Sequence, residues 1–243
     1  MNRRRYGFPL EADVPFYLFD DDMPLKSHPA YREAKAGNQE AATDIVADLA
    51  QKFVTEIGPK LPKDAIFSSP FAAEATGDNA IPQVLSVACA SVAGGVAEED
   101  IVQITRVFHT GADPMERLAM RPKFEGLVQE GVIYVLVDDV TTMGGTLAEL
   151  SDYIRKGGGV VKGAVLLVNA GRLKQLVPDK RMLKKLKERY PNEIAELFGI
   201  EVDALTANEA EYLIGFRTID EIRNRLAKAQ KETDIRLRSK RIK

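Results

Sequence analysis

Cysteine and histidine are scarce in this chain: Cys89 is the only cysteine, and His28 and His109 are the only histidines, among 243 residues. A single cysteine excludes a disulfide within the chain and a zinc site built on cysteines. Two histidines leave little for a metal site rich in histidine. Chemistry that depends on clusters of thiols is therefore excluded.

Long apolar runs are also missing. No run approaches the ~18–20 residues that are needed to span a bilayer. The basic start of the chain, Arg3-Arg4-Arg5, is not followed by the apolar stretch of a secretory signal. We therefore expect a cytoplasmic protein with no membrane partner.

Charge is unevenly distributed along a chain whose composition, 45% hydrophobic and 29% charged, excludes a wholly disordered protein. Residues 1–171 hold 16 Lys and Arg against 24 Asp and Glu, a net charge of −8, whereas residues 172–243 hold 18 against 12, a net charge of +6. The basic part is either a solvated helical surface or a contact for an anionic partner such as nucleic acid.

Hydrophobic patterns predict alternating strands and helices. Predicted strands cover 14–19, 65–67, 101–108, 132–137 and 160–168, and predicted helices cover 38–57, 81–96 and 146–156. Asp138 is expected to end the strand before it, and residues 109–121 are expected to be irregular. This order is typical of an α/β fold with a doubly wound, mostly parallel sheet. We divide the chain into an N-terminal elaboration (1–63), an α/β core (64–171) and a basic helical C-terminal extension (172–243).

The segment from Val135 to Thr146, VLVDDVTTMGGT, carries the strongest chemical signal. A buried strand would bring Asp138 and Asp139 to the carboxyl edge of a parallel sheet, where open α/β folds bind ligands. The following loop of threonines and glycines opens a helix, so backbone N–H groups and the helix dipole can hold a phosphate. Two carboxylates beside a phosphate loop suit a phosphorylated pentose, because each carboxylate can accept hydrogen bonds from hydroxyls.

Two common nucleotide motifs are absent. The P-loop requires Gly-x4-Gly-Lys-Ser/Thr, and the loop after Asp139 has no such lysine. The dinucleotide motif Gly-x-Gly-x-x-Gly is also missing, and Gly157-Gly158-Gly159 follows a predicted helix rather than a strand. The loop is therefore not predicted to bind a nucleotide in either of these ways.

The motif resembles the signature of the type I phosphoribosyltransferases, which bind 5-phosphoribosyl 1-pyrophosphate (PRPP) with Mg²⁺. The resemblance implies that Asp138 and Asp139 bind the ribose hydroxyls and are catalytic residues. It also implies a 5′-phosphate site at Thr141, Thr142, Met143, Gly144, Gly145 and Thr146. Met143 departs from the family pattern, which has a threonine there, so we expect weaker phosphate binding by about 0.5–1.5 kcal/mol.

The resemblance extends to a pyrophosphate site, by position only. It implies contacts from Ser69, Pro70, Phe71 and Ala72, a stretch that has no Lys or Arg, and from a catalytic loop over 106–121. Arginine suits this role because its planar guanidinium can bind two phosphate oxygens. The candidates in and beside this loop are Arg106, Arg117 as a catalytic residue, Arg121 and Lys123, each of which could equally be a solvated side chain. His109 could carry a proton or be a bystander.

These features predict an enzyme that transfers the phosphoribosyl group of PRPP to a nitrogenous acceptor and releases pyrophosphate. Its cofactor would be Mg²⁺, held mainly through PRPP, and we expect a homodimer. The alternative is a non-catalytic PRPP-binding or nucleic-acid-associated protein, similar to the competence-associated (ComF-like) branch of the family. The absence of an aspartate at Thr142 argues against a 6-oxopurine enzyme.

Overall fold

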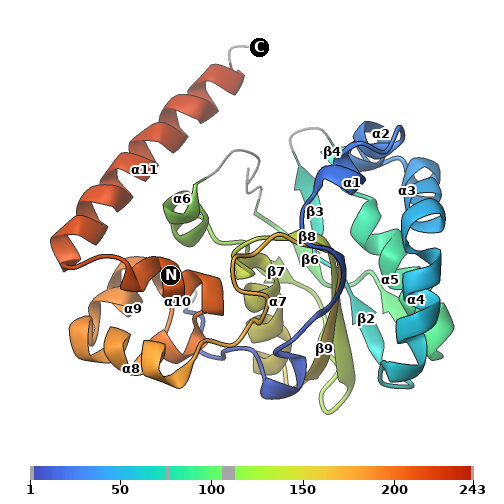
Figure 1. Ribbon diagram of the computed structural model, residues 1–243, viewed down its shortest axis with the longest axis horizontal. Coiled ribbons are helices and arrows are strands. Elements are labelled where there is room, and N and C mark those ends of the chain that lie inside the picture. The colour runs from blue at the N-terminus through green and yellow to red at the C-terminus, as the bar shows by residue number, and fades with distance from the viewer. Residues whose placement is uncertain (1–2, 75–76, 106–112, 242–243) are drawn as a thin grey trace.

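A five-stranded parallel sheet forms the centre of the structure, a computed structural model that describes residues 3–74, 77–105 and 113–241 (Figure 1). The strand order is β1-β9-β8-β2-β5, and every neighbouring pair is parallel. The strands are β1 (Phe16–Phe19), β2 (Ile66–Ser68), β5 (Val96–Glu98), β8 (Ile133–Thr141) and β9 (Val160–Asn169). The predicted α/β class with a mostly parallel sheet is confirmed.

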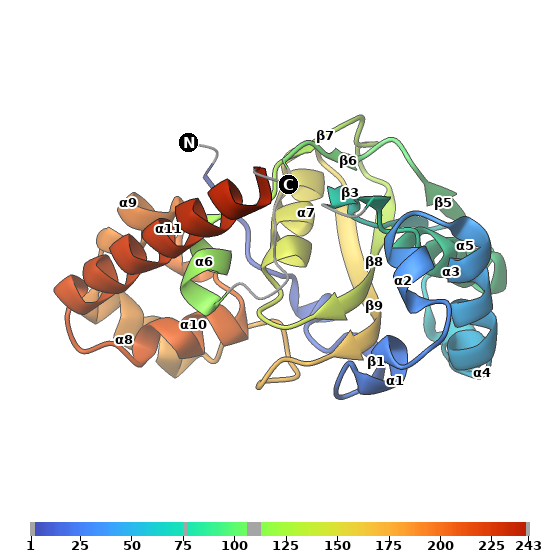
Figure 2. The same ribbon diagram turned by 90° about the horizontal axis from the view of Figure 1, so that it is seen from above.

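Both faces of the sheet are covered, which explains why its central strands are almost continuously apolar. Val135 and Val137 of β8 face a core that they share with the helices on one side, while Tyr134 and Leu136 face a second core on the other side. Figure 2 shows α5, α3 and α4 on one side of β8 and β9 and α7 on the other. The helices of the sheet layers are α1 (Met23–Lys26), α2 (Tyr31–Lys35), α3 (Gln39–Ile45), α4 (Gln51–Ile57), α5 (Ile81–Ala93) and α7 (Gly145–Lys156).

The helix predicted over 38–57 is present, with an interruption. The Asn38 side chain accepts a hydrogen bond from the Ala41 backbone N–H at 3.0 Å and so caps α3. A π-helical turn, η2 (Val46–Ala50), separates α3 from α4, and a 3₁₀ turn, η3 (Gly58–Lys60), follows. Two further 3₁₀ turns are η1 (Leu10–Ala12) and η4 (Val202–Ala204).

The region between β2 and β8 differs from its prediction. Gly94 adopts a left-handed conformation (φ +75°) and ends α5, so Val96, predicted to end this helix, starts the edge strand β5. Of the strand predicted over 101–108, residues 106–108 lie outside the described residues, and the described part forms only β6 (Val102–Gln103), which lies outside the main sheet. A second small sheet, in the order β4-β3-β6-β7, contains it together with β3 (Phe71–Glu74), β4 (Gly77–Asp78) and β7 (Phe124–Glu125).

A short helix, α6 (Pro114–Ala119), occupies part of the stretch that was predicted to be irregular. Asp113 and Glu116 form a capping box, in which each side chain accepts a hydrogen bond from the other residue's backbone N–H. Pro114 occupies the first turn, where its missing N–H costs nothing. The sequence Asp-Pro-x-Glu therefore signals a helix start, although Gly111 and Pro114 suggested a loop.

The C-terminal extension forms a helical unit with its own core. Its helices are α8 (Lys180–Arg189), α9 (Glu193–Phe198), α10 (Ala207–Ile214) and α11 (Ile219–Arg241). A capping box of Thr206 and Glu209 starts α10. Met115 and Leu118 of α6 are buried in the core of this unit, so α6 belongs structurally to the C-terminal helices (Figures 1 and 2). No helix within the described ranges is both long and apolar enough to cross a membrane.

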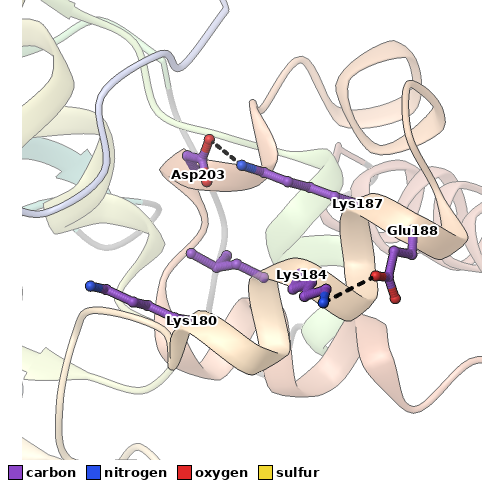
Figure 3. Close-up of a pocket in the computed structure, with 6 residues that line it drawn as sticks. Lys180, Lys184, Lys187, Glu188 and Asp203 are labelled. Atoms are coloured by element: carbon purple, nitrogen blue, oxygen red, sulfur yellow. Dashed lines mark hydrogen bonds and ion pairs between the residues drawn. The ribbon is translucent and has the colours of Figure 1, made fainter.

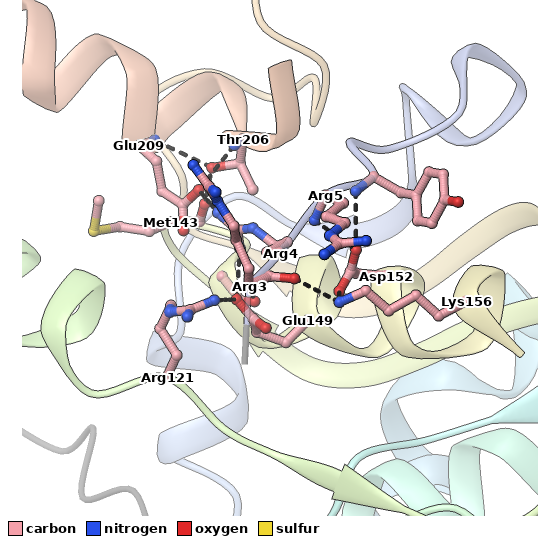
Figure 4. Close-up of polar contacts among 12 residues, drawn as sticks. Arg3, Arg4, Arg5, Arg121, Met143, Glu149, Asp152, Lys156, Thr206 and Glu209 are labelled. Carbon is pink, nitrogen blue, oxygen red and sulfur yellow. Dashed lines mark hydrogen bonds and ion pairs between the residues drawn. The ribbon is translucent and has the colours of Figure 1, made fainter. Parts of the chain in front are cut away.

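A buried cluster of ion pairs joins the N-terminal segment to α7 and to the helical unit (Figure 4). Arg4 is completely buried, and its guanidinium pairs with Glu209 of α10 and, at 3.4 Å, with Glu149 of α7. Arg121 pairs with the same Glu149 at 2.5 Å. Burial raises the pKa of Glu149, while the two arginines favour its charged form. Three distant parts of the chain are thus held together by charges that have little access to water.

Replacing Arg4 should therefore strongly destabilise the fold. We expect Arg4→Met to lower the free energy of unfolding by about 3–5 kcal/mol, because two buried carboxylates lose a cation. Arg5→Met is the matched control, since its side chain is exposed, and should change stability by less than about 0.5 kcal/mol. Urea denaturation of both variants measures the difference, and equal effects would contradict a special role for Arg4.

Candidate functional site

The acid pair lies inside β8, which continues past the position where it was predicted to stop. Asp138 pairs in register with Leu166 of β9, and Thr141 pairs with Asn169. The prediction that Asp138 ends the strand is therefore wrong, because the β9 ladder continues to the carboxyl edge. Asp138 and Asp139 are only 9% and 4% exposed. The backbone ladder holds both acids in fixed positions.

Burial and mutual repulsion dominate the electrostatics of the acid pair. The Asp138 carboxylate accepts a hydrogen bond from the Asp139 N–H, and the Asp139 carboxylate accepts one from the Val140 N–H, both at 2.9 Å. Loss of water and the neighbouring charge of Asp139 raise the pKa of Asp138 well above its usual range. The site is therefore stabilised when a proton, or another positive or hydrogen-donating group, neutralises this charge.

Lys35 provides such a group, and the sequence had not indicated it. Its ammonium, at the end of α2, lies 3.1 Å from the Asp139 carboxylate and opposes the rise in the pKa of Asp138. The two residues are 104 positions apart, so no local spacing could have linked them. Lys35 also adds a positive charge to an edge that is otherwise acidic, as a site for a polyanion requires.

The glycine loop follows the acids directly and opens α7. Gly144 adopts φ +77°, a conformation that side chains with a Cβ rarely take, and α7 begins at Gly145. The first N–H groups of a helix have no intrahelical partner and point along the positive end of its dipole. The predicted phosphate residues Thr142, Gly144, Gly145 and Thr146 therefore surround a helix N-terminus, as a phosphate loop requires.

Met143, the residue that departs from the family pattern, has a structural role in the loop. Its side chain is 8% exposed and lies in the core of the C-terminal helical unit. Thr206 donates a hydrogen bond to its backbone carbonyl at 2.5 Å (Figure 4). The Met143 side chain is thus occupied in packing rather than in binding. The methionine fixes the loop to the helical unit. This packing gives a reason for the departure from the family pattern, which the motif alone could not reveal.

The helical unit also closes one side of the loop. A Cβ at Gly144 would lie 3.4 Å from both Leu176 and Thr206, and one at Gly145 would lie 3.1 Å from the Glu209 carboxylate. The capping box of α10 is thus packed against the loop. Residues 172–243 therefore fold back onto the predicted phosphate site.

The predicted pyrophosphate segment after β2 lies at the same edge of the sheet. Ser69 and Pro70 are buried there, and the backbones of Phe71 and Ala72 pair with β6 in the small sheet. The preceding residue, Ser68, donates a hydrogen bond to Glu98 of β5 at 2.5 Å. Burial raises the pKa of this glutamate. The segment contributes no cation, so any anion there would depend on backbone N–H groups.

The predicted cationic residues lie in different places. Arg106 and His109 lie outside the described residues. Arg117 lies on α6, where burial lowers its pKa while Glu116 and Asp113 favour its charged form. Arg121 is engaged with Glu149 (Figure 4). Lys123 is exposed beside β7. The structure thus joins Arg121 to the buried ion pairs and places Arg117 with the helical unit.

Within the described ranges, no group of three or more His, Cys, Asp or Glu side chains could hold a metal ion. The described site consists of an acid pair and a glycine loop at a helix N-terminus, at the carboxyl edge of a parallel sheet. Chemically, it can accept hydrogen bonds from vicinal hydroxyls and bind a phosphate beside them.

Two curated proteins are similar to the chain in sequence. Protein TraN of Escherichia coli is 38% identical over 232 residues, which cover 91% of this chain and 51% of that protein. An uncharacterized protein of Haemophilus influenzae is 36% identical over 150 residues, covering 59% of this chain and 33% of that protein. The chain thus spans about half the length of the first relative and a third of the second. No family model matches the chain.

Solved structures with a partly similar fold include two adenine phosphoribosyltransferases. The enzyme of Thermoanaerobacter pseudethanolicus superposes with a TM-score of 0.36 and 15% identity, covering 54% of this chain and 73% of that one. The enzyme of Saccharomyces cerevisiae gives a TM-score of 0.33 and 13% identity, covering 62% and 75%. These scores are too low to carry an argument about function, which must come from the site.

The raised pKa of Asp138 predicts a pH-dependent stability. Between the ordinary and the raised pKa, the folded protein binds more protons than the unfolded chain, so stability falls as pH rises through this window. Asp138→Asn keeps the hydrogen-bond acceptor and removes the charge. We expect it to raise Tm at pH 8, with a gain that shrinks as pH falls to 5. Thermal unfolding across this range tests it. Asp44→Asn, an exposed control, should show no such trend, and a lower Tm of Asp138→Asn at pH 8 would contradict the argument.

The position of Met143 predicts that restoring the family's threonine is harmful. Met143→Thr places a hydroxyl in an apolar core and leaves a cavity, so it should destabilise the protein by about 1–3 kcal/mol. Met23→Thr is the control, because Met23 is 64% exposed and its replacement should have little effect. Urea denaturation compares them. A stabilised Met143→Thr variant would contradict the assigned structural role.

Proposed function

We propose that the chain binds PRPP at the carboxyl edge of its sheet and is a phosphoribosyltransferase for a nitrogenous acceptor. The observation that carries the proposal is the placement of Asp138 and Asp139 immediately before the loop at the N-terminus of α7. In this assignment, the two carboxylates accept hydrogen bonds from the ribose hydroxyls and the loop N–H groups bind the 5′-phosphate.

The reaction needs positioning and charge stabilisation more than covalent catalysis by the protein. The acceptor nitrogen attacks C1 of the ribose, the bond from C1 to the pyrophosphate oxygen breaks, and the nitrogen loses its proton to solvent or a base. The transition state resembles an oxocarbenium ion, so fixed carboxylates nearby lower its free energy. The rigid placement of both acids on β8 supplies this without rearrangement of the backbone.

Mg²⁺ would neutralise the pyrophosphate in this reaction. It prefers oxygen ligands and retains several waters, so PRPP oxygens and water would supply most of its shell. The carboxylates of Asp138 and Asp139 are oxygen donors of the kind that fit such an ion. Lys35 would add a further positive charge beside the bound polyanion, because it already lies 3.1 Å from Asp139.

A second candidate is a protein that binds PRPP without turning it over. Arg121, one of the proposed pyrophosphate ligands, is engaged with Glu149, and Ser69 to Ala72 provide no cation. Such a site would hold the ribose phosphate well and the leaving group poorly. This candidate makes the same binding prediction but predicts no release of pyrophosphate.

Ligand binding should raise thermal stability. PRPP with Mg²⁺ at about 100 times its Kd should stabilise the protein by about 2.7 kcal/mol. In Asp138→Asn/Asp139→Asn, the increase in Tm on adding ligand should disappear, because the ribose hydroxyls lose their charged acceptors. Glu40→Gln/Asp44→Asn removes two exposed acids of α3 and should retain the full increase.

The outcomes separate the candidates. An increase in Tm together with pyrophosphate release in the presence of one of a panel of nitrogenous bases supports the transferase. An increase without release from any base supports the non-catalytic binder. If PRPP and Mg²⁺ leave the Tm of the unmodified protein unchanged, both candidates fail.

A further inference from the structure

Helix α8 carries the densest positive charge of the described helices. Within ten residues it has six basic side chains and one acidic side chain, Glu188. Only Leu186 is buried, and the basic side chains are exposed. They are Lys180, Arg181, Lys184, Lys185, Lys187 and Arg189.

Part of this charge is placed against the stability of the helix, although Asp179 caps its start and Lys187 and Arg189 lie favourably in its last turn. Lys180 and Arg181 lie in the first turn, which contains no acidic residue and where the helix dipole disfavours cations. Lys180 and Lys184 are four residues apart, as are Arg181 and Lys185, so like charges repel along the helix. A segment that departs in this way from local preferences marks a candidate functional surface.

Neighbouring acids neutralise only part of this surface. Lys187 pairs with Asp203 at 2.7 Å and Lys184 pairs with Glu188 at 3.8 Å, beside a groove of about 460 Å³ (Figure 3). Lys180, Arg181 and Lys185 form no ion pair with any residue in the described part of the chain. Three exposed positive charges are therefore available to a partner.

In the part of α11 whose side chains the structure describes, residues 219–233, three of the four basic side chains form ion pairs. Arg225 pairs with Asp113, Arg223 pairs with Asp220 at 3.2 Å, and Lys228 lies 3.8 Å from Glu232. These contacts attach α11 to α6 or neutralise it locally. Helix α8 thus has more basic side chains without an ion pair than the described part of α11 has.

We propose that the exposed face of α8 binds the phosphate backbone of double-stranded nucleic acid. A duplex presents closely spaced phosphates, which a row of lysines and arginines can neutralise with release of counterions. The exposed residues of α8 include no aromatic side chain on which the bases of a single strand could stack. Because the whole chain has a net charge of −2, attraction to a polyanion must come from a local surface of this kind.

The test is fluorescence anisotropy of the full chain with a labelled 20-base-pair DNA duplex over a range of salt concentrations. The variant Lys180→Gln/Arg181→Gln/Lys185→Gln removes the three available charges and leaves the ion pairs of α8 intact. We expect affinity at low salt to fall at least ~10-fold, and the slope of log K against log salt to become smaller by about 2.7, or about 0.9 for each lost phosphate contact.

The matched control is Lys52→Gln/Lys60→Gln/Lys63→Gln, which changes net charge equally at exposed positions on α4, on η3 and beside η3. It should bind the duplex like the unmodified protein, and circular dichroism verifies that both variants are folded. Equal weakening by the two variants, or no duplex binding by the unmodified protein, would overturn the proposal. So would preferred binding to the labelled single strand or to phosphatidylserine vesicles. PRPP binding is a separate measurement, so failure here leaves the proposed function to its own test.

Discussion

A fully buried guanidinium must be paired, and the pairing of Arg4 determines how the parts of this protein fit together. Its two partners are Glu149 on α7, the helix that the glycine loop opens, and Glu209 on α10, which packs against the loop. Removing water from these charges is costly, so they stay together only if all three segments remain docked. The loop is consequently held between a helix of the core and a helix of the C-terminal unit.

This arrangement gives the C-terminal unit two faces with different roles. Its inner face, through Thr206 and the core around Met143, supports the loop that is proposed to bind phosphate. Its outer face carries the charges of α8. The unequal distribution of charge in the sequence therefore has a spatial meaning, because the acid pair lies in the central sheet and the basic residues of α8 lie on the C-terminal unit.

Much of the fold could be predicted from the sequence, because buried parallel strands and capped helices leave strong local patterns. The acid pair and the loop were identified for the same reason, since they follow one another along the chain. The contact of Lys35 with Asp139 and the burial of Arg4 could not be predicted, because each depends on residues more than a hundred positions away. Val96 was assigned to a helix because the apolar pattern continues past Gly94, the residue that ends α5. The residues of α6 were assigned to a loop because Gly111 and Pro114 concealed the capping box.

The continuation of β8 through the acid pair also bears on the entropy of ligand binding. Asp138, Asp139 and Thr141 belong to a strand that is already paired with β9, so binding would freeze little backbone motion there. Lys35, in contrast, extends from a short helix on a long side chain, and most of the conformational freedom still to be lost resides in such groups. Discrimination between ligands would then arise mainly at the periphery of the site, while its centre acts as a rigid template.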